Sequence, residues 1–551
     1  MIDRSVLVAA KAEPVPLSVR SLPFHAPHAA EFIKARSRKS EAGSQASVVS
    51  TLDRRVQGRV ERIAQSYRAQ LNRLGARNAS VVVIENDTRK VRALVGNLDF
   101  WDTDAAGQVA GFAAPRSSGS TLKPFLYALA LEKGVVTPES LVEDAPVQIG
   151  SFRPLDFGES WEGLVTAERA LSQSLNVPFV HILQRTGLER FLKLLKDGGL
   201  DYRQETAYGL SVITGALEVN LLDLTNLYVT LARGGMHSSY LIDLKSQIPN
   251  PKSQIAPAFH LLNPAAVHLT RRALSIRSRP DAPLVGVATA AGGKVFWKTG
   301  TSWGFRDAWS IGFNGQYTVG VWAGNFSGRH AKGIVGAQAA APLMFDILAA
   351  VTTEDRAIAA PPPSGFSRVA VCEHSGYRAT PACPGTKQVV TVKDAAPARE
   401  CPYHKQYLVE NESGMRACLW KLYPEGEVSQ RAMTVYPPSV ADVLSAADAR
   451  PPPLSPSCAV QATGDTLRIV SPASGASYVM TEGVRNTGRI PLQGYTSVRD
   501  KTISWFINNR YVGDTRSGET KLVSLSPGPS KIVAVNSAGH KDKAEVAVSA
   551  P

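Results

Sequence analysis

The chain has 551 residues, of which 44% are hydrophobic and 20% charged, and 61 basic residues outnumber 47 acidic ones to give a net charge of +14. This length predicts two to four folded domains. The positive charge favours contact with polyanions, but we expect no nucleic-acid partner, because zinc-finger spacing and basic stripes interleaved with aromatic residues are absent from the sequence. No apolar stretch approaches the roughly 20 residues that span a membrane, and the run from Val6 to Ala10 is too short for a signal-peptide core. We therefore expect neither a membrane span nor an export signal in this sequence.

A connector, a helix and a hairpin are expected in turn over the first 95 residues. Residues 1–50 hold spaced prolines followed by a basic, serine-rich run, which predicts a linker with little core of its own. A helix is expected from Thr51 onwards, because apolar residues then recur at intervals of three and four: Val56, Val60, Ile63, Tyr67, Leu71 and Leu74. Two β-rich runs, 80–85 and 90–95, are joined by Asn86-Asp87-Thr88 and predict a β-hairpin.

The stretch Gly119-Ser120-Thr121-Leu122-Lys123-Pro124-Phe125 is the first candidate for chemistry. Ser120 and Lys123 stand three residues apart and would share one face of a helix. Pro124 has no N–H and is tolerated only in a first turn, so we expect Ser120 at the N-terminus of a buried helix. A serine at the positive end of such a helix, beside a lysine, is suited to nucleophilic catalysis. Taken alone the short pattern is weak, and Ser120 could instead be a plain helix cap.

The next 230 residues predict a helical middle followed by strands. Periodicity is mostly helical from 141 to about 290, with clear examples at 188–195 and 221–231. Three strands separated by Gly and Asn turns are then expected, and a last helix follows them: 294–301, 308–314, 317–323 and 341–351. We expect one antiparallel sheet backed by the first and last helices, beside an all-helical lobe, with the catalytic cleft between sheet and lobe.

The five cysteines all lie in the last third of the chain: Cys372, Cys383, Cys401, Cys418 and Cys458. Their clustering favours two local disulfides and one unpaired thiol, which fits an oxidising compartment. The alternative is a zinc site formed by Cys372, Cys383, Cys401 and His404, which lacks the paired Cys-x-x-Cys spacing of common zinc motifs. After a proline-rich linker, short β runs from about residue 459 predict a small β-sandwich, which we interpret as a binding or spacer module.

Two further motifs strengthen the first. Ser174-Leu175-Asn176 lies in the helical middle, and Lys298-Thr299-Gly300-Thr301 lies on the first late strand. The ordered trio S-x-x-K, S-D-N and K-T-G is typical of penicillin-binding proteins and class A β-lactamases. Here Leu175 stands where that pattern has Asp. The order, the spacing and the expected structural context of the three motifs agree.

The chain resembles the class A penicillin-binding proteins around these motifs, over 116–125, 172–178, 298–302 and 306–309. It resembles the 1C type in three further places: the stretch 23–28, the cysteine segment 372–404 and the terminal β module. The resemblance implies an α+β fold, with a serine β-lactamase/transpeptidase-like domain followed by a small Ig-like β-sandwich. It implies a linker or remnant of a glycosyltransferase domain at 1–50 and a transpeptidase domain at 51–355. A cysteine-containing segment at 365–425 and a proline-rich linker at 426–458 follow, and a C-terminal β domain occupies 459–551.

The resemblance implies a peptidoglycan DD-transpeptidase that forms a serine acyl-enzyme with D-Ala-D-Ala stem peptides and binds penicillin. Ser120 would be the nucleophile and Lys123, with its pKa lowered by burial and by Lys298, the base. Ser174 would relay a proton and Asn176 would position the peptide amide. The substrate carboxylate would be held by the strand motif: Lys298, Thr299, Gly300 and Thr301. The backbone N–H groups of Ser120 and Thr301 would form the oxyanion hole.

The resemblance implies no cofactor and no metal for this chemistry. The implied partners are stem peptides, β-lactams and, through the C-terminal domain, other cell-wall synthesis proteins, at the periplasmic face of the inner membrane. Hydrolysis of the acyl-enzyme would add carboxypeptidase activity.

The family also carries an N-terminal membrane helix and a glycosyltransferase domain, whereas this sequence starts at what resembles the tail of that domain. We therefore expect that this chain alone does not polymerise glycan strands. Two other functions stay open at this point. A serine β-lactamase would need a deacylating glutamate after Asn176, for which we find no convincing candidate, and a degenerate wall-interaction protein would use the terminal β domain without chemistry.

Overall fold

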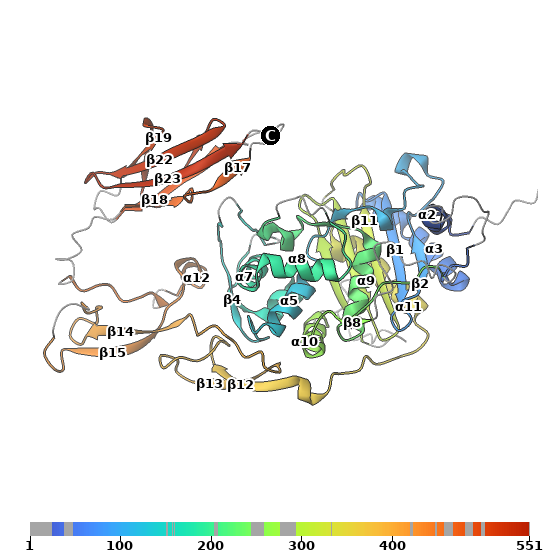
Figure 1. Cartoon of the computed structure of the whole chain (residues 1–551), viewed down its shortest axis with the longest axis horizontal. Coiled ribbons are helices and arrows are strands. Elements are labelled where there is room, and N and C mark those ends of the chain that lie inside the picture. Colours follow the sequence, from blue (N-terminus) through green and yellow to red (C-terminus); the bar gives the residue numbers. More distant parts are fainter. Residues whose placement is uncertain are drawn as a thin grey trace, which may run out of the picture. The chain divides into compact units, whose positions relative to one another are not determined.

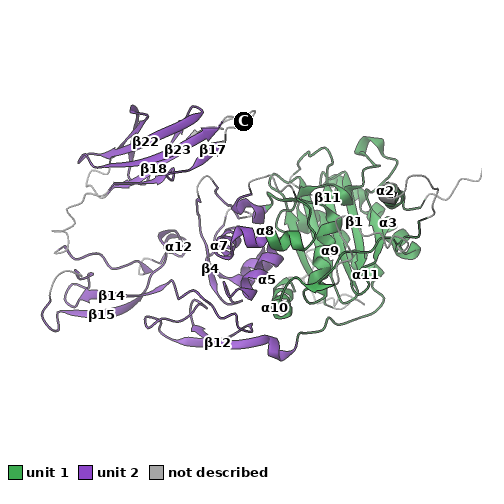
Figure 2. Ribbon diagram, in the orientation of Figure 1, with its two compact units in different colours: residues 1–122, 192–207, 215–361 green, residues 123–191, 208–214, 362–551 purple. Residues whose placement is uncertain are grey.

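The computed structural model divides the chain into two compact units, which are described separately (Figure 2). Unit 1 comprises residues 1–122, 192–207 and 215–361, and unit 2 comprises 123–191, 208–214 and 362–551. Among the helices that the structure describes, none combines the length and the apolar character needed to cross a bilayer. The described residues are 25–37, 48–149, 152–156, 158, 160–202, 208–243, 258–275, 294–331, 333–418, 423–446, 449–456, 467–479, 489–496 and 502–549.

Unit 1 is built on a five-stranded sheet in the order β2-β1-β11-β10-β9 (Figure 1). All its neighbouring strands are antiparallel. The strands are β1 (Asn78–Glu85), β2 (Val91–Val95), β9 (Phe296–Thr301), β10 (Asp307–Phe313) and β11 (Tyr317–Gly324). The early hairpin therefore joins the three late strands through the β1–β11 pair, in which Val82 lies opposite Gly320. The predicted antiparallel sheet is confirmed.

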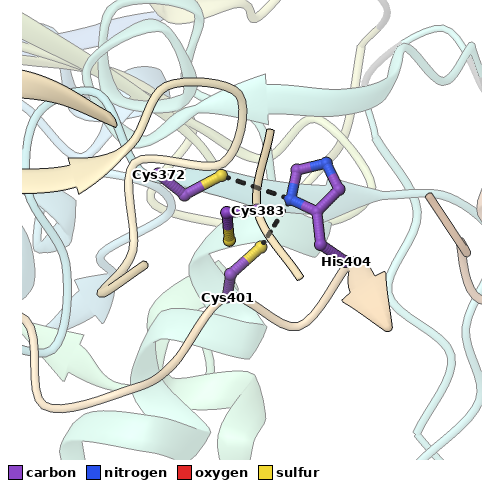
Figure 3. A group of neighbouring side chains, drawn as sticks. All are labelled: Cys372, Cys383, Cys401 and His404. Atoms are coloured by element: carbon purple, nitrogen blue, oxygen red, sulfur yellow. Dashed lines mark hydrogen bonds between the residues drawn. The ribbon is translucent and has the colours of Figure 1, made fainter. Parts of the chain in front are cut away.

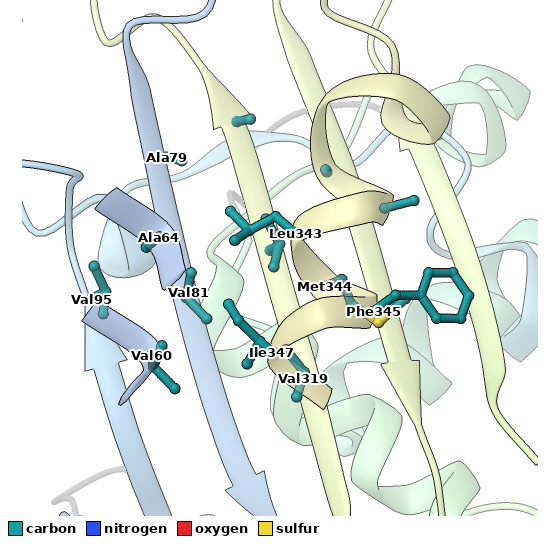
Figure 4. Close-up of a cluster of buried hydrophobic side chains, with 14 of the residues drawn as sticks. Val60, Ala64, Ala79, Val81, Val95, Val319, Leu343, Met344, Phe345 and Ile347 are labelled. Carbon is teal, nitrogen blue, oxygen red and sulfur yellow. The ribbon is translucent and has the colours of Figure 1, made fainter. Parts of the chain in front are cut away.

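Helices cover both faces of this sheet, which explains why β1 and β11 are buried along almost their whole length rather than at alternate residues. On one face α3 (Arg54–Ser66) and α11 (Ala341–Val351) contribute to a shared core, and α4 (Arg68–Arg73) follows α3 (Figure 4). On the other face α9 (Leu221–Ala232) packs on β1, β10 and β11. A Cβ atom on Gly320 would come within 2.1 Å of Thr225 Oγ1, so this glycine lets α9 approach the sheet closely.

Part of the N-terminal segment is more structured than the sequence predicts. Helix α2 (Pro27–Ser37) packs on β2, and its His28 and Ile33 are buried. His28 Nε2 lies 2.7 Å from the Gly107 carbonyl oxygen. The expectation of a linker with little core is therefore wrong for this helix, because a buried histidine and a few apolar residues anchor it despite the surrounding prolines. Residues 1–24 and 38–47 of this stretch lie outside the described residues.

The predicted helical middle contributes to both units. Unit 2 holds α5 (Lys123–Glu132), α6 (Ala167–Gln173), α7 (Val177–Thr186) and the start of α8 (Leu188–Asp197), and unit 1 holds α9 and α10 (Pro264–Leu274). The lobe is not all-helical, because β4 (Leu141–Asp144) pairs with β5 (Gly163–Thr166) in unit 2. Short strand pairs also occur in unit 1: β3 (Arg116–Ser117) with β6 (Glu218–Val219), and β7 (Met236–His237) with β8 (Phe259–His260).

The cysteine segment of unit 2 consists of two β-hairpins and a short helix. Strand β12 (Phe366–Cys372) pairs with β13 (Thr386–Val392), and β14 (His404–Glu410) pairs with β15 (Val428–Thr434), before α12 (Pro438–Val443). The predicted pair of local disulfides is wrong for three of the cysteines, because Cys372, Cys383 and Cys401 are free thiols. Cys418 is disulfide-bonded, whereas Cys458 lies outside the described residues.

The C-terminal part of unit 2 is a β-sandwich, as predicted. One sheet has the order β16-β18-β21 and the other β17-β23-β22-β19-β20. The two sheets share one core, to which Leu492 and Val523 contribute from the first sheet and Ile503, Trp505 and Ile532 from the second. The strands are β16 (Leu467–Ser471), β17 (Ser477–Val479), β18 (Arg489–Thr496), β19 (Thr502–Ile507), β20 (Arg510–Arg516), β21 (Thr520–Ser524), β22 (Gly528–Asn536) and β23 (Lys541–Ser549).

Candidate active site

The boundary between the two units falls between Leu122 and Lys123, inside the first sequence motif. Ser120 and the Lys298–Thr301 motif belong to unit 1, and Lys123, Ser174 and Asn176 belong to unit 2. Ser120 is half-buried in the turn before α5, which starts at Lys123 rather than at Ser120 as expected. Pro124 cannot donate to the Ser120 carbonyl, so regular helical hydrogen bonding begins only after it.

The turn that carries Ser120 lies against β9. Gly119 has φ +53°, and a Cβ atom there would lie 2.7 Å from Thr301 N. A Cβ atom on Gly300 would lie 2.8 Å from the Ser118 carbonyl oxygen and 3.4 Å from Ser120 N. Contacts below 3 Å leave no room for a side chain on either glycine. Glycine at these two positions therefore allows the backbone of the turn that carries Ser120 to contact the backbone of β9.

Three hydrogen bonds within unit 1 hold this turn in place. Trp309 Nε1, from β10, donates to the Ser117 carbonyl oxygen at 2.8 Å. The Tyr228 hydroxyl, from α9, donates to the Thr121 carbonyl oxygen at 2.6 Å, and Ser118 N–H donates to the Leu217 carbonyl oxygen at 3.0 Å. The sheet and its covering helix thus fix the backbone on both sides of Ser120.

The β9 motif presents one cation and two hydroxyls. Lys298 is buried, and its Nζ donates to the Thr299 carbonyl oxygen at 2.8 Å. Thr299 and Thr301 are half-buried, and Thr301 Oγ1 accepts from Gly336 N–H at 3.0 Å, which leaves its own proton to donate. Strand β9 is last in the strand order of the sheet, so an extended peptide could add beside it.

Within unit 2, Lys123 bonds to both of the other candidate site residues, Ser174 and Asn176. Its side chain is buried, and Nζ donates to the carbonyl oxygens of Ser174 at 2.7 Å and Leu175 at 2.8 Å and to Asn176 Oδ1 at 2.6 Å. Phe179 lies 5.6 Å from Nζ. Burial lowers the pKa of Lys123 to about 7, and the nearby Asp156 carboxylate opposes that shift. Lys123 therefore exchanges a proton near neutral pH.

The Ser174-Leu175-Asn176 turn connects α6 to α7 and surrounds this lysine. Ser174 caps α6 in the left-handed conformation, with φ 65°, which is unusual for a residue with a side chain. That reversal of the chain directs two successive carbonyl groups at Lys123. The Asn176 amide donates to the Leu155 carbonyl oxygen at 2.7 Å, so that its oxygen is free to face the lysine.

An acid that the sequence did not indicate, Asp156, supports this turn, and a second acid, Asp144, bonds to it. Buried Asp156 accepts a hydrogen bond from Asn176 N–H, and buried Asp144 accepts one from Glu162 N–H at 2.7 Å. Burial, followed by a hydrogen bond to Asp156, raises the pKa of Asp144 well above its ordinary value. Asp156 stands 20 residues before Asn176 in an irregular segment, so no spacing pattern marks it. The structure thus adds a carboxylate beside a motif that has Leu175 in place of an acid.

The candidate residues of the two units differ in chemical capacity. Unit 1 offers a half-buried serine beside a strand with an ammonium group and hydroxyls, a combination that can receive a carboxylate and an acyl group. Unit 2 offers a buried amine whose pKa is lowered to about 7 by burial and whose ammonium form donates to three oxygen acceptors. A base of this kind is what a serine hydroxyl needs in order to react.

Two family models match the chain. The penicillin binding protein transpeptidase domain matches residues 79–332, and the Penicillin-Binding Protein C-terminus Family matches 456–548. The first range contains all the candidate site residues, and the second covers the C-terminal β-sandwich.

Curated proteins that are similar to this chain in sequence are named as penicillin-binding proteins. Penicillin-binding protein 1C of Escherichia coli K12 is 31% identical over 380 residues, which are 68% of this chain and 46% of that protein. Penicillin-binding protein 1A of Neisseria meningitidis is 30% identical over 271 residues, 47% of this chain and 33% of the relative. The chain thus spans less than half the length of these curated relatives.

Solved structures share the fold. Penicillin-binding protein 1A from Haemophilus influenzae aligns with a TM-score of 0.56 at 16% identity, over 73% of this chain and 80% of that one. PonA1 from Mycobacterium tuberculosis aligns with a TM-score of 0.50 at 17% identity, over 61% of this chain and 98% of that one. The predicted α+β fold with a β C-terminal domain is confirmed.

Proposed function

Because the chain belongs to the class A penicillin-binding proteins, in the 1C type, we propose that it is a peptidoglycan transpeptidase that works through an acyl-enzyme on Ser120. The substrate is a stem peptide ending in D-Ala-D-Ala. Lys298, Thr299 and Thr301 bind its terminal carboxylate, since a cation and two hydroxyls match that group in charge and hydrogen-bonding capacity. Gly300 keeps the strand close enough to the serine turn for the scissile carbonyl to reach Ser120.

Acylation begins when Ser120 Oγ attacks the carbonyl carbon of the penultimate D-Ala and neutral Lys123 accepts the hydroxyl proton. The backbone N–H groups of Ser120 and Thr301 stabilise the oxyanion that forms. When the intermediate collapses, the peptide C–N bond breaks and Ser174 relays the proton to the departing amine of D-Ala. Asn176 positions the peptide amide and holds the lysine.

The acyl-enzyme is then resolved by an amine. The amine of a neighbouring stem attacks the ester carbonyl, a new amide forms and Ser120 Oγ regains its proton. Water in place of the amine gives a carboxypeptidase product. A β-lactam ring resembles the terminal dipeptide, so it acylates Ser120 and its opened ring stays attached. We place this chemistry at the cell envelope, and the C-terminal sandwich is available to bind other wall-synthesis proteins there.

One observation carries the proposal. Lys123 follows Ser120 by three residues, is buried, and has a pKa lowered to about 7. An ordinary lysine, with a pKa near 10.4, is almost wholly protonated at neutral pH and could not accept the serine proton. A lysine held half-neutral at this place in the chain has the protonation state that a general base requires.

Labelling of the full chain by a fluorescent penicillin tests the proposal. Wild-type protein is expected to form a stable adduct on Ser120, identified by peptide mass spectrometry, and Ser120→Ala is expected to remove it. Ser172→Ala is the matched control, because this half-buried serine of the neighbouring motif bonds only to a helix carbonyl, Arg169 O at 3.0 Å. Labelling that persists in Ser120→Ala, with the variant folded, would contradict the assignment. Rapid release of the hydrolysed drug from wild-type protein would instead indicate a β-lactamase.

A further inference from the structure

Three thiols and an imidazole from separate segments of unit 2 converge on one point (Figure 3). Cys372 ends β12, Cys383 lies in the loop before β13, Cys401 lies just before β14, and His404 begins that strand. Their candidate ligand atoms all lie within 4.8 Å of one another. Cys372, Cys401 and His404 are buried, and Cys383 is partly accessible.

We propose that this cluster is a structural Zn²⁺ site, with the sulfurs of Cys372, Cys383 and Cys401 and Nδ1 of His404 as ligands. In a tetrahedral site with the usual Zn–S and Zn–N bond lengths, neighbouring sulfurs are about 3.8 Å apart and a sulfur and a nitrogen about 3.6 Å apart. Cys372 Sγ and Cys401 Sγ each lie 3.3 Å from His404 Nδ1. Small shifts therefore suffice to seat the ion, and zinc binding displaces the thiol protons.

The approach of two sulfurs to the same nitrogen is better explained by a metal than by hydrogen bonds. An imidazole nitrogen carries at most one proton, or one lone pair that accepts one. It cannot make full hydrogen bonds to Cys372 and Cys401 at once in a stable thiol cluster. Around a shared cation, in contrast, all four atoms point inwards because each donates a lone pair to the same ion.

Backbone amides bond to two of the sulfurs. Thr380 N–H donates to Cys383 Sγ at 3.3 Å, and the backbone amides of His374 and Ser375 bond to the sulfur of Cys372. Amide hydrogen bonds to a thiolate offset its negative charge and orient it, as outer contacts of metal ligands commonly do. Neutral buried thiols would gain little from three such donors.

A disulfide explains the cluster less well. Three cysteines cannot pair completely, so any one disulfide would leave one thiol unpaired beside the imidazole. The structure instead has all three as free thiols. Zinc satisfies the three sulfurs and the nitrogen together, and a set of three thiolates and one imidazole is among the common structural zinc ligand sets.

This segment also needs a stabilising link. Its strands form two separate two-stranded sheets, and an isolated hairpin is marginally stable in water. Among the described residues, the local apolar cluster has three buried members, Cys372, Cys401 and Tyr403, packed with partly buried neighbours. A zinc ion that joins the end of β12 to the start of β14 would tie the two hairpins together.

The ion would also brace the half of unit 2 that carries Lys123. The turn after Cys372 docks on the loop that follows α5, where Leu141 N–H donates to the Ser375 carbonyl oxygen at 2.8 Å and Ser140 Oγ to the Gly376 carbonyl oxygen at 3.0 Å. On α7, Arg185 donates to the Tyr377 hydroxyl at 2.9 Å. The metal site and the helical half of the catalytic machinery therefore share one packed surface.

Metal analysis of the untagged full chain, purified without chelator and desalted after incubation with excess Zn²⁺, tests the proposal. We expect one zinc per chain and no reaction of Cys372, Cys383 and Cys401 with a thiol reagent until the ion is removed. Cys401→Ser and His404→Asn should each lose most of the zinc. His374→Asn is the matched control, because its ring lies only 5.7 Å from that of His404 but bonds to the Tyr436 hydroxyl, and it should keep one equivalent.

Cobalt substitution of the wild-type chain keeps the test valid if a ligand variant fails to fold. Co²⁺ in a tetrahedral site with three thiolates is expected to give intense visible bands and thiolate-to-cobalt charge-transfer absorption, which one equivalent of Zn²⁺ abolishes. The proposal is overturned if the folded wild-type chain retains no zinc and gives no such spectrum. It is also overturned if peptide mapping finds a disulfide between any two of the three cysteines in the protein as isolated.

Discussion

At the scale of single residues, Lys123 controls when the proposed site is active. The amine accepts the serine proton only in its neutral form, and its pKa is about 7. Acylation of wild-type protein by a β-lactam should therefore rise with pH through about 7 and level off above it. Below that range the ammonium is retained by its three oxygen acceptors.

Asp156 should influence the pH at which the acylation rate reaches half of its maximum. Its carboxylate raises the pKa of Lys123, so Asp156→Asn should lower that pKa further and move the acylation profile to lower pH. A shift of about one pH unit would raise the ratio of the rate at pH 6 to the rate at pH 8 about fivefold, from about 0.1 in wild-type protein to about 0.5 in the variant. The asparagine still offers an oxygen to Asn176 N–H, which separates the charge effect from loss of the turn.

The control for this prediction removes a charge elsewhere in unit 2. Glu189 is exposed on α8, and Glu189→Gln should leave the pH profile of acylation unchanged. Second-order acylation rates from pH 5.5 to 9 measure both variants. If the Asp156→Asn profile moves to higher pH, or if the acylation rate falls by the same factor at every pH, Asp156 has only a structural role.

At the scale of elements, a mutation can test whether acylation requires the close approach of β9 to the turn that carries Ser120. Gly300→Ala adds a Cβ atom where the Ser118 carbonyl oxygen would lie 2.8 Å away and Thr121 Cγ2 2.7 Å away. The strand must then move, and Thr301 N moves with it. We expect a fall in the acylation rate on the order of 100-fold, the cost of removing one oxyanion donor.

The matched change is Gly58→Ala on α3, where nothing lies within 4 Å of the added atom and the backbone is helical. It should keep the wild-type acylation rate and stabilise its helix slightly. Circular dichroism establishes that both variants are folded before acylation is compared. A Gly300→Ala protein that acylates at the wild-type rate would rule out the need for this backbone contact.

At the scale of the whole molecule, the chain forms two compact units, and the C-terminal part of unit 2 is a sandwich with its own core. We predict that residues 459–551 fold alone. Trp505 is the only tryptophan in that range, and it is fully buried, with Nε1 donating to Thr515 Oγ1 at 2.8 Å. Its fluorescence should therefore report one cooperative unfolding transition in urea.

Substitutions in this domain check that the sandwich core is the source of its stability. Ile503→Ala should lower the free energy of unfolding by about 2–5 kcal/mol, since it opens a cavity between the sheets. Val470→Ala, at a position 50% exposed, should change it by no more than about 0.5 kcal/mol. Equal effects of the two substitutions, or the red-shifted emission of an exposed tryptophan in buffer, would contradict an independent domain.

Much of the fold follows from local patterns. The 341–351 helix, the hairpin around Asn86 and the strand that carries Lys298 lie where the sequence predicts them, because apolar periodicity and turn residues act over a few residues. The β4–β5 hairpin inside the helical lobe was missed. Its strands are only four residues long, too short for alternation to stand out from the helical pattern around them.

The sequence by itself determined the motifs and their order, since Ser120, Lys123, Ser174, Asn176 and the Lys298–Thr301 stretch are recognised by residue type and spacing alone. The tertiary structure decided which segments that are distant in the sequence come into contact. The contact of Asp156 with Asn176 joins segments that no local spacing rule connects. For the cysteines the sequence offered both disulfides and a cluster with His404, and the folded chain has three free thiols beside that histidine. Proton affinity and metal affinity depend on burial and on which groups meet in space, and these are properties of the folded chain rather than of any short stretch of it.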